Sequence, residues 1–104
     1  MTLPISVAPA ATFDIADGTT AYEATRSGLG REFLHELRRA RFQIERFPAG
    51  SQQVLPGVWR CLIRRFPFGV FYRTLPDRIE IVAVLPTQAD PFRLTVRAEL
   101  ARSQ

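Results

Sequence analysis

The chain has 104 residues, 46% of them hydrophobic and 23% charged. This composition excludes an intrinsically disordered protein and gives no sign of a membrane protein. The length fits one domain with one core, so we expect a single domain over residues 1–104. Cys61 is the only cysteine, which excludes an intrachain disulfide, and the N-terminus lacks the pattern of a secretory signal. We therefore expect a cytoplasmic protein without a membrane-spanning segment.

The net charge of +4 is unevenly distributed along the chain. All 14 cationic side chains are arginines. Residues 1–52 contain six arginines and six acidic residues, whereas residues 53–104 contain eight arginines and four acidic residues, so the whole net charge lies in the second half. Such a basic half is typical of proteins with an anionic partner, either nucleic acid or an acidic protein segment. Charge alone does not distinguish the two, and it also serves solubility.

A short strand and two helices are expected in the first half of the chain. Alternating apolar residues predict a strand at residues 3–7, and Pro4 favours the edge of a sheet. A helix is expected from residue 10 to about 26, and a break at residues 27–30 precedes a second helix from residue 31 up to Pro48. Side chains spaced by three or four residues predict the buried stripe of this second helix, namely Leu29, Phe33, Leu37, Ala40, Ile44 and Phe47.

Two residues of the second helix lie away from that stripe. Phe42 is opposite to it, so this ring either contacts the first helix or marks a contact for another chain. His35, the only histidine, has no Cys or His companion and no nearby nucleophile motif. We interpret it as a solvated helix residue rather than as a metal ligand or catalytic base.

Residues 58–73 are expected to form a β-hairpin around a turn at residues 65–67, because Pro67 interrupts two alternating runs. Alternation places Trp59, Cys61, Ile63, Phe68, Val70 and Tyr72 on one face, and Arg60, Leu62, Arg64, Gly69, Phe71 and Arg73 on the other. The hairpin therefore has one apolar face and one arginine-rich face. We expect Trp59 to be buried with Phe33 between the sheet and the helices.

The remaining segments complete a small α+β fold. Residues 49–57 are rich in Gly, Pro and Ser and are expected to form a loop, and residues 75–78 a turn. Residues 79–85 form a β-branched run that predicts a central strand buried on both faces. Asp90 followed by Pro91 favours the start of a short C-terminal helix over residues 90–102.

A set of short motifs extends over about residues 3–97. They are residues 21–23 (AYE), the 28–33 segment GLGREF, residues 44–48 (IERFP), Arg60, residues 64–73 (RRFPFGVFYR), residues 81–84 (IVAV), and Asp90-Pro91 with a later Arg97. In these motifs the chain resembles the RelE/ParE family of type II toxin-antitoxin toxins, closer to ParE. The resemblance implies the order β-α-α-β-β-β with a possible C-terminal helix. It also implies a helical hairpin on a mainly antiparallel sheet whose other face is a basic groove.

The same resemblance implies a cognate antitoxin, which is expected to be acidic, and a cellular target. The target is DNA gyrase in ParE-like members, and the ribosome with its mRNA in members that act as endonucleases. The chain departs from the nuclease pattern, because residues 86–89 (PTQA) lack the histidine and basic pair of many relatives, and Phe92 stands where a tryptophan or tyrosine is usual. Arginine cannot exchange protons near neutral pH, and alternation places Tyr72 on the apolar face, so no base is evident.

We therefore expect a toxin that binds its partners through a basic face and has no catalytic residue, metal or cofactor. The residues of the expected basic face are Arg60, Arg64, Arg65, Arg73 and Arg97. Phe42 and Phe92 are candidate partner contacts. Two alternatives stay open: an endonuclease with an unrecognised base such as His35, and a non-toxic binding module that keeps the same fold.

Overall fold

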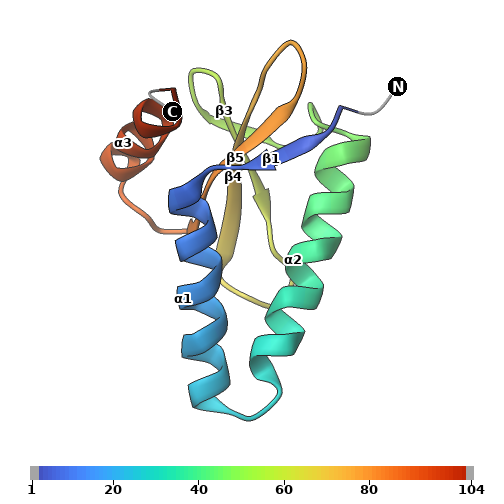
Figure 1. Ribbon diagram of the computed structural model, residues 1–104, viewed down its shortest axis with the longest axis vertical. Coiled ribbons are helices and arrows are strands. Elements are labelled where there is room, and N and C mark those ends of the chain that lie inside the picture. The colour runs from blue at the N-terminus through green and yellow to red at the C-terminus, as the bar shows by residue number, and fades with distance from the viewer. Residues whose placement is uncertain (1–2, 103–104) are drawn as a thin grey trace.

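The computed structural model describes residues 3–102. In these residues the elements are β1 (Ile5–Val7), α1 (Pro9–Thr25), α2 (Leu29–Arg46), β2 (Gln52–Leu55), β3 (Val58–Leu62), β4 (Phe68–Thr74), β5 (Ile79–Pro86) and α3 (Pro91–Arg102). The long helices α1 and α2 form a hairpin beside a twisted sheet (Figure 1). The expected α+β fold class is confirmed, and so is the short C-terminal helix.

The five strands form one sheet in the order β1-β5-β4-β3-β2. Strand β1 pairs in parallel with β5, while the other three pairs are antiparallel. Strand β5 lies between β1 and β4, an interior position that agrees with its burial on both faces, and β1 lies at an edge as Pro4 indicated. None of the helices in the described part of the chain is both long and apolar enough to cross a membrane.

The other edge strand, β2, was missed by the sequence analysis, which assigned residues 49–57 to a loop. Gln52 pairs with Arg60 and Gln53 with Trp59, and the register is irregular before Leu55. Gln52 and Gln53 are exposed, and Val54 and Leu55 only half-buried. The strand therefore lacks the alternation of a half-buried strand, because backbone pairing with β3 holds it rather than side-chain burial.

The main core lies between the helical hairpin and one face of the sheet. Phe33 and Tyr72 are fully buried at its centre. The rings of Tyr22, Phe33, Phe66 and Phe68 form a cluster with centroids 4.8 to 5.9 Å apart, a spacing at which aromatic pairs attract each other beyond their area burial. Gly18 lets this cluster approach α1, since a Cβ atom there would lie 3.1 Å from the Phe33 ring.

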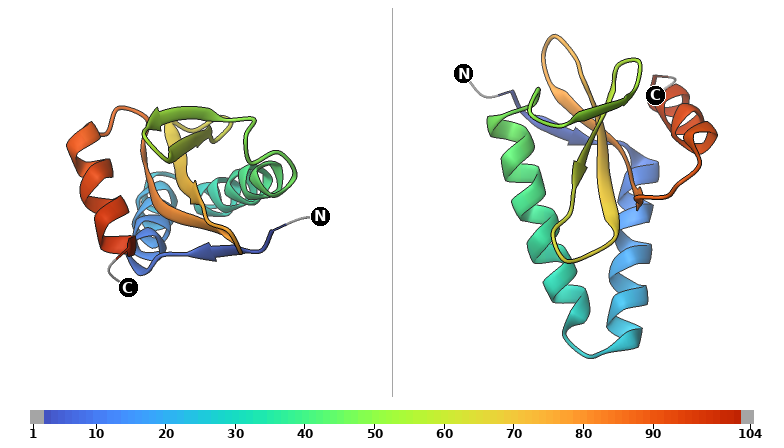
Figure 2. Two further views of the ribbon diagram at one scale, coloured as in Figure 1. Left: turned by 90° about the horizontal axis from the view of Figure 1, so that it is seen from above. Right: turned by 180° about the vertical axis from the view of Figure 1, so that it is seen from behind.

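A second apolar cluster covers the opposite face of the sheet. Leu94, Ala98 and Ala101 of α3 pack against buried residues of the strands, namely Val58, Phe71, Val82, Ala83 and Leu85. The left view of Figure 2 shows α3 on the opposite side of the sheet from α2. The prediction that this face is an open basic groove is therefore wrong for the part beneath α3. Phe71 does point to the predicted face, but a helix covers it.

Two side chains expected in the main core are less buried than predicted. Phe47 is 59% exposed, because α2 ends at Arg46 and the Phe47 backbone leaves the helical conformation. Trp59 is half-buried and packs at the margin of the cluster that contains Phe33. Only the short strand β2 lies beyond β3 at this edge of the sheet, so Trp59 keeps part of its surface in solvent.

Candidate partner-binding site

Ion pairing divides the arginines into two sets. Eight of the 14 make an ion pair with a carboxylate, and among the described residues the other six make none. The unpaired set is Arg31, Arg38, Arg46, Arg60, Arg64 and Arg93. Paired arginines contribute little net field, so the positive potential of the surface comes mainly from this unpaired set.

Arg73 and Arg97, both expected on the basic face, make ion pairs within the fold. Arg73 donates to Glu80 at 2.8 and 2.7 Å. Arg97 binds both carboxylate oxygens of Asp14 at 2.6 and 2.7 Å, and this hydrogen bond raises the pKa of Arg97. Their side chains are only 15% and 16% exposed. Both guanidinium groups thus join elements of this chain.

Arg65 is also held by its own fold. Its Nη2 donates to Glu32 at 2.7 Å, and Arg26 binds the other oxygen of the same carboxylate at 3.0 Å. The hydrogen bond with Glu32 raises the pKa of Arg65. Arg65 lies within the turn between β3 and β4 and has a φ of 71°, in the left-handed region. This exposed pair links the tip of the helical hairpin to the β3–β4 turn.

Arg60 lies across the sheet at the β2 edge. Its Nη2 donates to Gln52 Oε1 at 2.8 Å, and its Nε is buried without a hydrogen-bond partner. The aliphatic part of the side chain crosses Gly69, where a Cβ atom would come within 2.9 Å of Arg60 Cγ. Gly69 therefore provides the space in which Arg60 lies flat.

Arg64 lies in a groove between α2 and β3 with a volume of about 550 Å³. We call this the α2–β3 groove. It is lined by His35, Glu36, Arg38, Arg39, Ala40, Phe42, Gln43, Leu62 and Arg64. Phe42 and Leu62 are 58% and 57% exposed, which is high for large apolar side chains. The groove thus combines exposed apolar surface with arginines, two of which, Arg38 and Arg64, are unpaired.

A smaller hollow of about 260 Å³ shares Gln43 and Leu62 with the groove and extends it toward Arg60 and Gln52. Cys61 also lines this hollow, and burial raises the pKa of its thiol. Cys61 is buried, in agreement with its predicted place on the apolar face of the hairpin, and burial makes its thiol less reactive. Together the two hollows follow β3 from Arg64 to Arg60.

His35 lies beside the β3–β4 hairpin, which its position on the second helix did not indicate. His35 is exposed on α2 and lines the same groove as Arg64. Sequence periodicity placed it on the outer face of α2 without indicating that β3 runs alongside that face. Tyr72 is buried, donates its hydroxyl to the Pro48 carbonyl at 2.6 Å, and has a pKa raised by burial. Burial and this hydrogen bond therefore hold Tyr72 in the core. In residues 3–102 no group of three potential metal-ligating side chains occurs.

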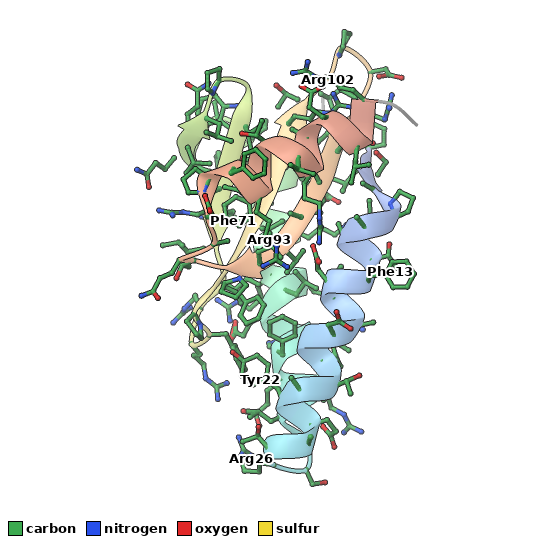
Figure 3. All side chains as sticks on the ribbon, turned by 90° about the vertical axis from the view of Figure 1, so that its left-hand side faces the viewer. Phe13, Tyr22, Arg26, Phe71, Arg93 and Arg102 are labelled. Carbon is green, nitrogen blue, oxygen red and sulfur yellow. The ribbon has the colours of Figure 1, made fainter. Side chains whose placement is uncertain are left out.

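The two candidate contact residues lie on different surfaces. Phe42 is in the α2–β3 groove, where the Arg46 guanidinium lies 5.5 Å from its ring centroid. Phe92 is 72% exposed in the first turn of α3, next to Arg93. Arg93 lies on the α3 side of the molecule (Figure 3), where it lines a separate cavity with Asp14 and Asp17. The structure brings together Arg64 and Phe42 and places Arg60 nearby. Phe92, Arg65, Arg73 and Arg97 do not line this groove.

Comparison with known proteins supports the fold. No protein-family model and no curated protein matches the chain. Its structure is similar to a chain of the "Chromosomal ParDE TA system from P. aeruginosa", with a TM-score of 0.73 and 16% sequence identity. The match covers 82% of this chain and 96% of that chain. The protein therefore has the ParE-like fold that the sequence resemblance implied.

Proposed function

We propose that this protein is the toxin of a type II toxin-antitoxin module, held inactive by an acidic antitoxin, and that it inhibits a protein target such as DNA gyrase in the cytoplasm. The observation that carries this proposal is the fold likeness to a chain of a ParDE TA system over 96% of that chain's length.

Features of the surface support a binding function. The α2–β3 groove offers unpaired guanidinium groups beside exposed Phe42 and Leu62, a combination suited to an acidic protein segment. Arginine supplies fixed positive charge and paired donors, which serve recognition, but it makes a poor proton shuttle. Of the five arginines predicted to bind partners, Arg60 and Arg64 make no ion pair with a carboxylate in residues 3–102, whereas the other three do. We propose these two as the first partner contacts and rank Arg65, Arg73 and Arg97 after them.

A second candidate function is ribosome-dependent cleavage of mRNA. One observation favours it: His35 lines the groove together with Arg38 and Arg64. A histidine can exchange a proton near neutral pH, and neighbouring arginines can stabilise phosphate charge. The two functions therefore make opposite predictions for the removal of the imidazole.

Induced expression in a bacterial host tests the proposal, with and without co-expression of a short acidic protein encoded by a neighbouring gene. We expect growth arrest when the protein is expressed alone, filamentation with DNA breaks, and rescue by co-expression. His35→Ala should leave the arrest intact, and Arg64→Gln should weaken it. Transcripts cut within codons at the ribosomal A site, with cleavage abolished by His35→Ala, would instead support the endonuclease. Normal growth at full expression would contradict both toxin functions and favour a non-toxic binding module.

A further inference from the structure

Helix α3 has apolar side chains on two opposite faces. Its inner face packs against the sheet. On its outer face Phe92, Val96 and Leu100 are 72%, 41% and 46% exposed, and their four-residue spacing places them in one row, which we call the α3 outer stripe. The outer side of a surface helix is normally polar, and a helix that is apolar all round is normally buried. The α3 outer stripe therefore has the character of a covered surface.

This stripe is a different surface from the α2–β3 groove. The left view of Figure 2 shows α3 on the opposite side of the sheet from α2, and no residue of the stripe lines the groove or the hollow that extends it. A segment bound in the groove therefore leaves the stripe uncovered. The stripe includes Phe92, which was predicted from the sequence to contact a partner.

Two charged side chains border the stripe, one on each side. Arg93 lies about 60° to one side of Val96 around the helix axis, and Glu99 lies about 60° to the other side. Arg93 is exposed and belongs to the unpaired set of arginines. The Glu99 side chain is 64% exposed and makes an ion pair with Arg102 of its own helix at 3.4 Å. A row of apolar side chains with an arginine on one border and a glutamate on the other can complement a second copy of itself.

The border charges also determine the direction of such a pairing. In a parallel pair of helices, related by a two-fold axis along α3, the Arg93 border of each copy lies beside the Glu99 border of the other. The two positions differ by about 9 Å along the helix axis, close to the offset at which flanking charges pair in parallel coiled coils. In an antiparallel pair, Arg93 would lie on the same side as Arg93 of the second copy, and Glu99 on the same side as Glu99. Repulsion between like charges therefore favours the parallel pair.

From these features we propose that the α3 outer stripe is a homodimer interface, in which two copies of the protein pack their α3 helices side by side in the same direction. Phe92, Val96 and Leu100 contact the same residues of the second copy, and Arg93 pairs with its Glu99. Because each copy contributes only three large side chains, the interface is small, and a dissociation constant on the order of 10–100 µM is expected. This inference goes beyond the proposed function and does not depend on it.

The first test compares two exposed phenylalanines. Phe92 and Phe13 are 72% and 71% exposed, but Phe13 lies on α1, outside the stripe (Figure 3). Analytical ultracentrifugation of the free wild-type protein should show a shift from monomer to dimer between about 5 and 500 µM. Phe92→Ser should raise the dissociation constant about tenfold or more, and Phe13→Ser less than about twofold. Circular dichroism checks that each variant is folded.

Exchange of the two border charges tests the direction of the pairing. Arg93→Glu and Glu99→Arg each place like charges together in the parallel dimer, so each should raise the dissociation constant about fivefold. The double variant restores opposite charges with their positions exchanged, so its dissociation constant should return to within about twofold of the wild-type value. In an antiparallel dimer the single changes would keep like charges together and leave association unchanged.

Cross-linking gives a second readout of the direction. Single cysteines are placed at Val96, at Leu100 or, as a measure of random collision, at Phe13, in a protein whose own Cys61 is replaced by alanine. A short bismaleimide then joins the cysteines of two copies. Val96→Cys should cross-link in either direction of pairing. Leu100→Cys should cross-link above the Phe13→Cys background only in the parallel dimer, because an antiparallel pair places Leu100 opposite Phe92.

The outcomes separate this inference from the proposed function. Dimers that are weakened by Phe92→Ser, respond to the charge exchange and cross-link through Leu100→Cys support it, whether or not the protein arrests growth. A monomer at every concentration, or a dimer that Phe92→Ser leaves unchanged, overturns it. Cross-linking through Val96→Cys but not through Leu100→Cys overturns the parallel arrangement. A free protein that stays monomeric, and loses its growth arrest through Phe92→Ser but not Phe13→Ser, would assign the stripe to the cellular target instead of a second copy.

Discussion

The carboxylate of Asp14 connects three elements of the fold. One of its oxygens accepts the Val84 backbone N–H at 3.0 Å, and both oxygens bind Arg97. Asp14 thus joins α1 to β5 and to α3. Its side chain is 6% exposed, so loss of the carboxylate would leave a partly buried guanidinium without its anion.

Replacement of Asp14 with alanine should therefore be strongly destabilising. Removal of one partner of a buried ion pair costs about 3–5 kcal/mol of unfolding free energy, because the remaining charge and the Val84 N–H lose their partner. The neighbouring Asp17 is exposed, so Asp17→Ala is a matched control with an expected change within about 0.5 kcal/mol. Urea denaturation measures both. Equal stabilities of the two variants would contradict a structural role for Asp14.

Glu23 shows how a carboxylate can close the helical hairpin. Its oxygens accept the backbone N–H groups of Gly28 and Gly30 at 3.0 to 3.1 Å. These groups lie at the start of α2, where backbone donors lack intrahelical partners. The hydrogen bonds, first that of Gly28, lower the pKa of Glu23 below its ordinary value of 4.5.

This lowered pKa predicts a loss of stability in acid. Since the folded state holds Glu23 ionised more strongly than the unfolded state does, its contribution is complete above pH 4.5 and is lost as the pH falls through the folded value. Glu23→Gln should be less stable than the wild type at neutral pH and lose less stability on acidification. Denaturant unfolding at a series of pH values measures both slopes, and parallel slopes would refute the assignment.

At the scale of elements, α3 is held on the sheet by a thin apolar contact. Its buried side chains are Leu94, Ala98 and Ala101, of which only Leu94 is large. The other attachment is the ion pair of Arg97 with Asp14. An element with little buried apolar area opens more readily than the rest of a fold.

Truncation of Leu94 should therefore loosen α3 selectively. Leu94→Ala is expected to cost about 2–5 kcal/mol of local stability, because it removes the one large side chain between α3 and the sheet. The same change at Leu100, which is 46% exposed, serves as the control. Limited trypsin digestion should cut the Leu94 variant faster at Arg93 and Arg97. Unchanged digestion would mean that the ion pair alone holds α3.

Local patterns in the sequence predicted most helices and strands but not how these elements pack against one another. The stripe of α2 from Leu29 to Ile44, the hairpin and the strand buried on both faces follow from periodicity, and all three are confirmed. The strand β2 was missed because its exposed glutamines give no alternation. Alternation placed Phe71 on the arginine-bearing face correctly, yet the covering of that face by α3 depends on long-range contacts.

The candidate site was harder to predict than the fold. The sequence does not show which arginines form ion pairs, so it does not distinguish Arg73 and Arg97 from Arg64. Their partners, Glu80 and Asp14, lie 7 and 83 residues away along the chain. The position of His35 beside Arg64 likewise depends on the packing of α2 against β3. The pairing of a buried Asp14 with a distant arginine left no local signal.

At the scale of the whole molecule, ion pairs between arginines and carboxylates determine where the surface is positively charged. The sequence places the net charge of +4 in residues 53–104, but five of the eight arginines in that half are paired with carboxylates. The unpaired arginines include Arg31, Arg38 and Arg46 of α2, together with Arg60 and Arg64 of the adjacent strand and turn. The positive field is therefore centred on α2 and β3, across two halves of the sequence.

This charge distribution predicts that an acidic partner stabilises the protein in a salt-dependent way. A partner that binds only the folded state adds about 2.7 kcal/mol at a concentration of 100 times its dissociation constant. Salt shortens the Debye length to about 8 Å at physiological strength and weakens contacts between exposed charges. The partner-induced rise in melting temperature should accordingly shrink as sodium chloride is added. The melt of the protein alone at each salt concentration is the control, because its own ion pairs, such as that of Arg65 with Glu32, are screened as well. A melting temperature unchanged by saturating partner, or a shift independent of salt, would show that the unpaired arginines do not carry the interaction.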